Sequence, residues 1–447
     1  MRSDANSAEH ARRRRGVRPR LIACSLAVFV AFATRPAHAQ SPPTSDGANP
    51  GSRQNAGAAT EQSPNADETV DVIDLIRRLR GKDPPPSGEA EFDYRKPMRA
   101  LAPVIGAKPS SGVIAGVAGN VGFFRGEPPT THISSSVASV TVTTKKQAGI
   151  SAHTTMFGGG DRWLLELDHR FQWTSQETFG LGTNTASPAG EVVRFDFYRL
   201  YQSAYYRLRP HLFAGGGLYF DDHADVRPDE GGEEQWPQSP YYQYSTANGL
   251  PLDAQISAGP SVEIIWDSRD SFINASYGWF ARASYRTLID GFLGADSSWE
   301  KLNLDLRTYA PLSADRRRRL AIWAYADLVV DGVAPYFDLP STGSDSYGRS
   351  GRGYAEGHFR GEKLAFLELE YRAPLMRNDL LGMVAFVNAT TISNRQSGEQ
   401  LFDHFAAGAG AGLRVLLNKR SRTNLAFDVG FGEEGNRGVY LVVQEAF

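Results

Sequence analysis

The residue types that carry out catalysis occur in this chain of 447 residues, but their spacing forms no catalytic motif. The string nearest to the G-x-S-x-G nucleophile motif reads G-R-S-G-R at 348–352, and Arg352 breaks it at the last position. The nine His are scattered, and no H-E-x-x-H zinc motif occurs. Asp168 and His169 are adjacent in an expected strand, so their side chains face opposite ways and cannot form a dyad. We expect no enzyme activity and no metal or other cofactor.

The elements that position these residues have a period of two. Residues 301–307 read K-L-N-L-D-L-R, residues 367–372 read L-E-L-E-Y-R, and residues 163–173 alternate in the same way, with His169 as the polar misfit on the apolar face. Such alternation indicates strands with one apolar and one polar face. A soluble sandwich gives the same pattern, but charged polar faces and aromatic strand ends favour a membrane barrel with a wet interior.

The N-terminal segment has the pattern of an export signal. A basic stretch at 12–20, an apolar stretch at 21–34 and the string A-H-A at 37–39 predict a signal peptide at 1–39, cleaved after Ala39. The alternative is an N-terminal membrane anchor, but the apolar stretch is shorter than the roughly 18–20 residues that span a bilayer. We therefore expect secretion and a Gram-negative cell outer membrane as the destination.

Composition excludes several classes of protein and partner. With 41% hydrophobic and 22% charged residues, the chain is too polar for a bundle of membrane helices. Removing the net +6 of residues 1–39 from the whole-chain −2 leaves −8, which gives no reason to expect nucleic acid as a partner. The only cysteine, Cys24, lies in the signal peptide, so the mature chain is expected to form no disulfide.

Residues 40–98 are expected to form a periplasmic low-complexity linker. Residues 40–66 are rich in Ser, Pro, Gly, Asn and Ala, which is typical of disorder. A short helix is expected near 67–80, where apolar residues fall on one face and three Arg lie in the last turn. This helix is either a solvated periplasmic helix or a plug or docking segment in the barrel mouth.

The expected fold is all-β: a transmembrane antiparallel β-barrel of about sixteen strands over residues 99–447, preceded by the signal peptide and the linker. Every backbone polar group must be paired in lipid, so exported strands in a membrane must close into a barrel. An even number of strands puts the long connections 175–190, 223–252 and 332–360 on the outer side. The aromatic residues of 223–252 either pack over the mouth or bind a surface ligand. The expected strands are 99–107, 112–124, 131–144, 147–157, 162–174, 191–207, 209–222, 253–267, 278–289, 296–309, 319–331, 361–375, 379–391, 402–416, 422–431 and 437–447.

The last expected strand, 437–447, ends on an aromatic residue. Phe447, Val443 and Leu441 share one face of this strand. We interpret Tyr440, Leu441, Val443 and Phe447 as a C-terminal insertion signal, since barrel-insertion machinery reads such terminal aromatic strands. The expected partners are therefore the barrel-assembly machinery during biogenesis, and outer-membrane lipid and lipopolysaccharide afterwards.

Two segments resemble the BamA/TamA type of outer-membrane protein, also called the bacterial surface antigen superfamily. Asp267, Arg269 and Asp270 look like the family's D-x-R-D periplasmic turn. The strings G-R-G-Y at 351–354 and E-L-E-Y-R-A-P-L at 368–375 resemble the R-G-Y/F tip of the long sixth outer loop and the E-x-R-x-P strand after it. The resemblance covers 99–447 and implies five strands after the long loop, as the alternation also predicts.

The resemblance implies that the long loop folds back into the lumen and carries a motif at its tip. Arg352 offers a planar fork of donors that suits a carboxylate, and Glu370, with Glu368 nearby, is the implied acceptor. Gly353 allows the backbone to approach the wall, and Tyr354 adds a flat surface and a hydroxyl.

The chain departs from the family in two places. The family usually has F-x-D-x-G on the next strand, whereas residues 386–390 read F-V-N-A-T, so neutral Asn388 would leave Arg352 with Glu370 alone or weaken the contact. The assembly members carry periplasmic repeat domains before the barrel, and residues 40–98 are too few and too low in complexity for one. We expect a barrel-only member.

Two functions remain open from the sequence. The first is membrane-protein assembly or translocation at the seam between the first and last strands, with Arg352 and Glu370 bracing the opposite wall. Pro103 lacks a backbone donor and would weaken this seam, or it marks a bulge near the rim. The alternative is a passive pore, or a barrel that transports lipids or small solutes.

Overall fold

The computed structural model describes residues 69–81, 94–108, 112–128, 130–184, 190–346, 348–443, 445 and 447. All of them lie in one compact unit, Glu68–Phe447. The signal peptide expected at 1–39 and the linker expected at 40–66 lie outside the described residues. None of the helices in this described part has the length and apolar character of a membrane-spanning helix.

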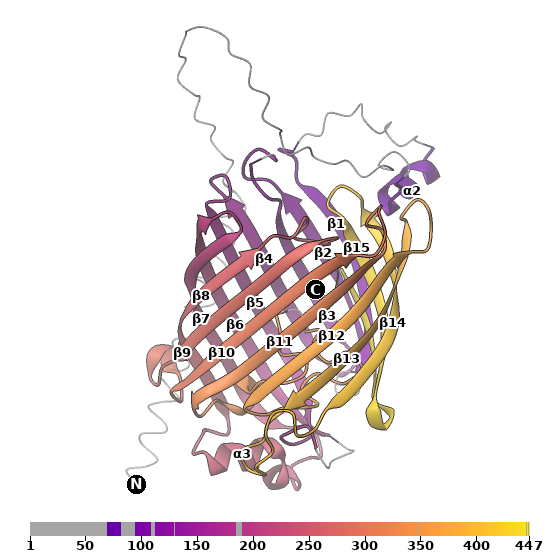
Figure 1. Cartoon of the computed structure of the whole chain (residues 1–447). Helices are drawn as coiled ribbons and strands as arrows, with labels where there is room; N and C mark the ends of the chain where they lie inside the picture. Colours follow the sequence, from indigo (N-terminus) through magenta and orange to yellow (C-terminus); the bar gives the residue numbers. More distant parts are fainter. Residues whose placement is uncertain are drawn as a thin grey trace. The chain divides into compact units, whose positions relative to one another are not determined.

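Sixteen strands form one sheet in which every strand pairs antiparallel with the next along the chain (Figure 1). The first and last strands, β1 and β16, lie side by side, so the sheet curves round into a barrel. The prediction of an all-β antiparallel barrel of about sixteen strands is confirmed. The strands are β1 (Met98–Lys108), β2 (Gly112–Phe123), β3 (Ser134–Thr143), β4 (Ala148–Gly158), β5 (Trp163–Thr178), β6 (Glu191–Arg209), β7 (Leu212–Pro228), β8 (Ala254–Asp267), β9 (Gly278–Leu288), β10 (Trp299–Pro311), β11 (Arg319–Gly332), β12 (Lys363–Pro374), β13 (Leu381–Ile392), β14 (Ala406–Asn418), β15 (Thr423–Gly432) and β16 (Arg437–Val443).

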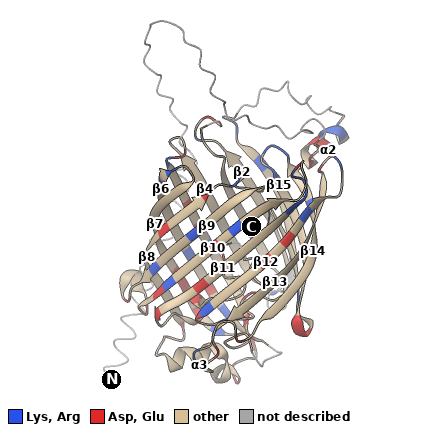
Figure 2. Cartoon of the chain, viewed as in Figure 1, with Lys and Arg blue, Asp and Glu red and all other residues tan. Residues whose placement is uncertain are grey.

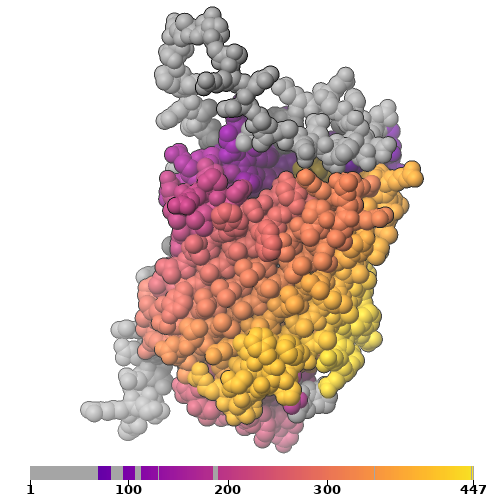
Figure 3. Space-filling view, in the orientation of Figure 1, coloured from indigo at the N-terminus to yellow at the C-terminus, as the bar shows by residue number. Residues whose placement is uncertain are grey.

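The wall has an apolar outer face and a polar inner face. On β12, Leu367 and Leu369 are 47% and 37% exposed, whereas Glu368 and Glu370 between and beside them are fully buried. This is the reverse of a water-soluble protein, since the carboxylates lie inside and the leucines outside. Side chains of the strands close the wall on the face in view in Figure 3. An apolar exterior over an antiparallel sheet that curves into a barrel is the arrangement of a transmembrane β-barrel.

The two ends of the barrel differ in the length of their connections. Strands β6 and β7 are joined by two residues and β14 and β15 by four, whereas the loops 229–253 and 333–362 lie at the opposite end. Long loops face the cell exterior and short turns the periplasm in outer-membrane barrels. The outer connections carry η1 (Trp236–Gln238), α3 (Pro240–Ala247), η2 (Phe292–Gly294), η3 (Tyr336–Asp338) and η4 (Glu433–Gly435).

The aromatic residues of the loop 229–253 pack over the outer mouth of the barrel. Tyr241 and Tyr244 are buried in one apolar cluster with Tyr336 of the loop 333–362. The Trp236 ring stacks on Tyr241 at 5.5 Å between centroids, and the Tyr244 hydroxyl donates to the carbonyl oxygen of Ala334 at 3.0 Å. Of the two interpretations of this loop, the contacts favour packing.

The last strand is shorter than its sequence predicts. We expected a strand over 437–447, but β16 ends at Val443. Beyond it, Glu445 is buried, and its carboxylate accepts from Arg414 Nε at 2.6 Å. Phe447 is buried with Trp323 in the lumen and does not lie on the outer face.

Helix α2 (Val72–Leu79) lies at the periplasmic rim (Figure 1). Asp71 caps its first turn and accepts the Lys419 backbone N–H at 2.9 Å, and Asp74 pairs with the Lys419 ammonium at 2.8 Å. The Val70 N–H donates to the carbonyl oxygen of Asn378 at 3.0 Å. The start of the helix is therefore fixed to the turns that join β14 to β15 and β12 to β13.

Candidate functional site

The loop 333–362 folds into the barrel and is held there by its own polar contacts. The Asp345 carboxylate accepts the backbone N–H groups of Arg349 and Ser350 at 2.8 and 2.7 Å. Arg360, which is 1% exposed, donates to the carbonyl oxygen of Tyr336 at 2.8 Å and to Gln176 of β5 at 3.1 Å. Arg360 therefore ties the end of the loop both to the start of the loop and to the wall.

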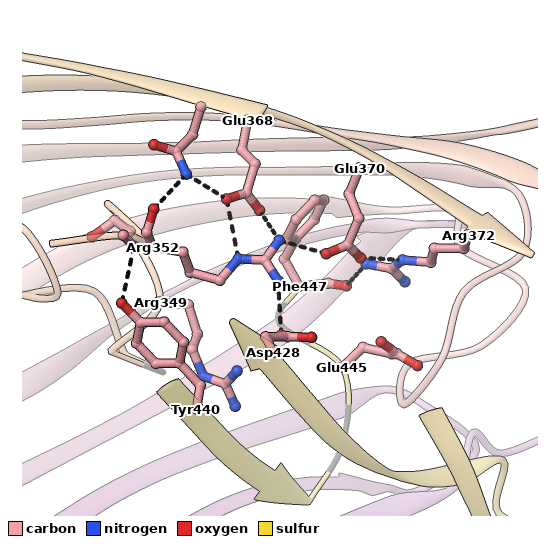
Figure 4. Close-up of polar contacts among 12 residues, drawn as sticks. Arg349, Arg352, Glu368, Glu370, Arg372, Asp428, Tyr440, Glu445 and Phe447 are labelled. Carbon is pink, nitrogen blue, oxygen red and sulfur yellow. Dashed lines mark hydrogen bonds and ion pairs between the residues drawn. The ribbon is translucent and has the colours of Figure 1, made fainter. Parts of the chain in front are cut away.

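Arg352 occupies the tip of this loop and contacts three carboxylates (Figure 4). Its Nη2 donates to Glu368 Oε1 and to Glu370 Oε2, both at 2.5 Å, and its Nε donates to Glu368 Oε2 at 3.2 Å. Its Nη1 donates to Asp428 Oδ2 at 2.8 Å. The guanidinium also lies over the Phe386 ring, 3.6 Å from the centroid. The Arg352 side chain is thus fully removed from water but paired at each of its nitrogens.

The strands bring these partners together by register. Glu368 and Glu370 point inward from β12, and β13 places Asn388 opposite Glu368. Asn388 Nδ2 donates to the carbonyl oxygen of Arg352 at 3.0 Å and to Glu368 at 3.2 Å. Asn388 therefore contacts the tip through its amide, and the second acid comes from β15 instead.

Asp428 was not predicted from the sequence as an acid partner of Arg352. The signal was present, because residues 425–431 of β15 alternate and put Asp428 on the inner face. The expectation that a neutral Asn388 leaves Arg352 with Glu370 alone is wrong: Glu368 makes two hydrogen bonds and Asp428 supplies the charge that Asn388 lacks.

Further cations extend the network toward the periplasmic side. Arg372 Nε donates to Glu370 Oε1 at 2.6 Å, and Arg414 pairs with Asp428 at 2.5 Å and with Glu445 at 2.6 Å. Shared carboxylates of this kind hold several strands in one charge network and are strongly coupled.

Arg349 lies buried beside the network, and its Nη1 has no hydrogen-bond partner among the described atoms. Burial lowers the pKa of Arg349 below its usual value, against the attraction of Asp428. With Arg349 counted, four arginines (349, 352, 372 and 414) balance four acids (368, 370, 428 and 445) in this part of the lumen.

Gly353 and Tyr354 tie the tip to the last three strands. Gly353 has φ +115°, and a Cβ there would lie 2.8 Å from the Phe431 carbonyl group of β15. Its N–H donates to the Tyr440 hydroxyl of β16 at 3.1 Å. The Tyr354 hydroxyl donates to the carbonyl oxygen of Ala407 on β14 at 2.6 Å. Only a residue without a side chain fits between tip and wall at position 353.

The expected periplasmic turn motif forms a separate site. Arg269 Nη2 pairs with Asp267 at 2.6 Å, and Asp270 accepts the Ser276 N–H at 2.7 Å and pairs with Arg422 at 2.9 Å. These residues close the turn between β8 and β9 and do not join the partners of Arg352.

The four residues of the expected C-terminal insertion signal do not share one surface. Tyr440 faces the lumen and contacts the loop tip. Val443 is buried in an apolar cluster with Ala102, and Leu441 pairs with Phe427 in the sheet. The Phe447 ring lies 5.2 Å from that of Trp323, and its carbonyl oxygen accepts from Arg372 at 2.9 Å.

The seam between β1 and β16 has no backbone ladder among the described residues. β1 pairs with β2 over eleven residues and β16 pairs with β15 over seven, but the described residues of β1 and β16 form no register with each other. Side chains bridge the seam instead, since Ala102 of β1 and Val443 of β16 belong to one apolar cluster.

A polar cavity lies between the loop 333–362 and the wall, nearer the outer mouth. Arg199, Arg286 and Asp338 are among the side chains that line it. Burial, reinforced by the charge of Asp221, raises the pKa of Asp338 to about 7. The Ser257 hydroxyl donates to Asp338 Oδ2 at 2.5 Å, which ties the loop to β8. No group of His, Cys, Asp and Glu in the described part of the chain is arranged to hold a metal ion.

Known proteins resemble this chain in part of its sequence and in its structure. The model of the Omp85 superfamily domain matches residues 223–440. The structure of BamA from Haemophilus ducreyi lacking POTRA domains 1–3 is similar at a TM-score of 0.51 and 14% identity, covering 78% of this chain and 69% of that one. CdiB from Acinetobacter baumannii is similar at 0.50 and 11% identity, covering 78% and 59%. The search of curated proteins finds no match. At these identities the structural likeness concerns the barrel fold.

Proposed function

We propose that this chain, whose residues 223–440 match the Omp85 superfamily domain, is an outer-membrane barrel that assists the insertion or translocation of client polypeptides at the seam between β1 and β16. The observation that carries this proposal is the seam itself. β1 has eleven residues and β16 has seven, and no backbone ladder joins them among the described residues.

A strand edge that lacks a hydrogen-bonding partner inside a membrane tends to pair with another strand. Backbone N–H and C=O groups that face lipid without partners cost several kcal/mol each. A client strand that pairs along β1 would satisfy them by β-augmentation. Pro103 lies in the middle of β1 and removes one backbone donor from the strand.

In this proposal, the loop tip supports the wall of the barrel from inside. We expected Arg352 and Glu370 to brace the wall opposite the seam. That expectation is wrong, because the tip contacts β12, β15 and, through Tyr440, β16, which form the wall beside the seam. The brace would hold β16 on its side while the edge of β1 receives a client. The partners proposed with this role are the barrel-assembly machinery, outer-membrane lipid and lipopolysaccharide.

Site-specific crosslinking tests the proposal. A photo-crosslinking amino acid is placed at Leu101, which is 75% exposed on β1, and at Val262, which is 66% exposed on β8 away from the seam. Outer-membrane clients in synthesis should crosslink to position 101 and not to position 262. Equal crosslinking at both positions, or none at position 101, would refute a seam-based mechanism.

The passive-pore alternative gives a different result in planar bilayers. The loop 333–362 fills part of the lumen, so the proposed function expects low conductance that rises on deletion of residues 335–358. A large conductance in the unmodified protein that the deletion leaves unchanged would favour a pore for solutes.

A further inference from the structure

Helix α2 presents an apolar face that the barrel covers only at its start. Val72, Ile76 and Leu79 are spaced for one face of a helix. Val72 packs against the cluster of Ala102 and Val443 at the seam. Beyond it, Ile76 is 43% exposed and Leu79 is 88% exposed. The face therefore begins on the barrel wall and continues past it without a protein partner in the described part of the chain.

Three arginines flank this exposed face. Arg77 and Arg78 lie in the last turn of α2 and Arg80 is its C-cap residue. All three are exposed, and the described residues place no carboxylate in a salt bridge with them. Figure 2 shows the basic residues along α2. The two acids of the helix start, Asp71 and Asp74, are both engaged by Lys419. The free end of α2 is thus apolar and cationic together.

The helix is fixed at the height where a membrane surface lies. Its start is bonded to the turn after β14 and, through Val70, to the turn after β12. Leu375 and Met376 of that second turn are 52% and 42% exposed. Exposed apolar side chains at the short-turn end of a barrel mark the boundary between the hydrocarbon and the periplasmic water. α2 continues this boundary outward from the wall.

We propose that α2 binds the periplasmic surface of the outer membrane, with Ile76 and Leu79 in the acyl boundary and Arg77, Arg78 and Arg80 on anionic lipid phosphates. An amphipathic helix with arginines beside its apolar face lies in such an interface. Each arginine near an anionic surface contributes about fivefold in affinity, or about 1 kcal/mol. The bound helix would hold lipid and the β1–β16 seam in a fixed relation, because Val72 packs at that seam.

Fluorescence quenching in nanodiscs tests this assignment on the full chain. With Cys24 replaced by Ser, a single cysteine at Leu79→Cys carries an environment-sensitive probe, and nitroxide lipids report its contact with the membrane. The matched control is Ala314→Cys, an exposed position on the periplasmic turn between β10 and β11. The probe at 79 should be quenched in discs of phosphatidylcholine with phosphatidylglycerol, less in phosphatidylcholine alone, and the probe at 314 in neither.

Charge variants separate lipid from other occupants. The quenching at 79 should fall by an order of magnitude or more with R77E/R78E/R80E, persist with R77K/R78K/R80K, and decrease with added salt in the unmodified arginine background. The salt titration keeps the test valid if the reversed variant unseats the helix. A probe at 79 that is quenched no more than the probe at 314, or that is shielded from water without lipid quenching, would overturn the proposal and assign the face to protein.

Discussion

Arg352→Ala should release the loop 333–362 from the lumen. The substitution removes the one cation that Glu368, Glu370 and Asp428 share, and all four side chains are at most 1% exposed. Arg372 and Arg414 stay beside two of the acids, but Glu368 keeps only the neutral amide of Asn388. With the loop docked, the Glu368 carboxylate of β12 is therefore buried without a cation. With the loop undocked, water can reach this carboxylate.

The size of the effect follows from the contacts. Removing one partner of a buried, hydrogen-bonded ion pair costs about 3–5 kcal/mol, which is roughly a 10²- to 10³-fold shift toward the undocked loop. Arg352→Lys keeps the charge but cannot reproduce the fork that joins Glu368 to Asp428. It should lose about half as much, since hydrogen bonds to charged groups contribute about 1.5–3 kcal/mol each. Arg227→Ala removes an exposed outer pair with Asp225 and should change docking by less than about 1 kcal/mol.

Limited trypsinolysis measures loop docking directly. Arg349 and Arg360 are 6% and 1% exposed in the docked loop, so cleavage after either one requires undocking. The cleavage rate at both bonds should rise strongly in Arg352→Ala, moderately in Arg352→Lys and not in Arg227→Ala, while the barrel remains folded. A wild-type cleavage rate in Arg352→Ala would refute the assignment of Arg352 as the residue that holds the loop.

Three further variants address other contacts of the loop. Gly353→Ala should also raise the trypsin cleavage rate, because its Cβ would clash with the Phe431 carbonyl group, whereas Gly435→Ala has positive φ but open space and should have the smaller effect. Asp338→Asn should remove a pH dependence of loop protection: with its pKa raised from 3.8 to about 7, Asp338 favours docking most below pH 4, and this advantage should be lost as the pH rises to 7 and then level off. Tyr440→Phe should leave the Gly353 N–H unpaired, costing about 1–3 kcal/mol, and speed hydrogen exchange at that amide.

The wall of the barrel could be predicted from the sequence because its physics is local. Each strand must alternate to face lipid on one side and water on the other, and that alternation is readable one segment at a time, as in 301–307 and 367–372. The end of β16 could not be predicted in this way. Glu445 interrupts an apolar pattern there, and its attraction to Arg414 depends on a residue of β14 that lies 31 positions earlier in the chain.

The site was predictable only in part, for the same reason. Alternation shows that Glu368, Asn388 and Asp428 all point inward, but which of them meet depends on the accumulated register of four strands and three connections. The family resemblance brought Arg352 and Glu370 together without that information. It pointed to an acid on β13, where this chain has Asn388, and did not point to Asp428, which reaches Arg352 from β15.

Tyr440 links the loop tip to β16, the strand on one side of the seam. β16 pairs with β15 over seven residues, forms no ladder with β1 among the described residues, and contacts the tip through the Tyr440 hydroxyl. If displacement of β16 by a client weakens docking of the tip by some factor, undocking of the tip must weaken the hold on β16 by the same factor, because coupling free energies are reciprocal. A client that opens the seam would therefore weaken the docking of the loop 333–362, and a ligand that releases this loop would make the seam easier to open. A passive pore does not need this linkage. In the proposed function, the linkage couples the opening of the seam to the release of the loop, and lateral insertion of a client requires both.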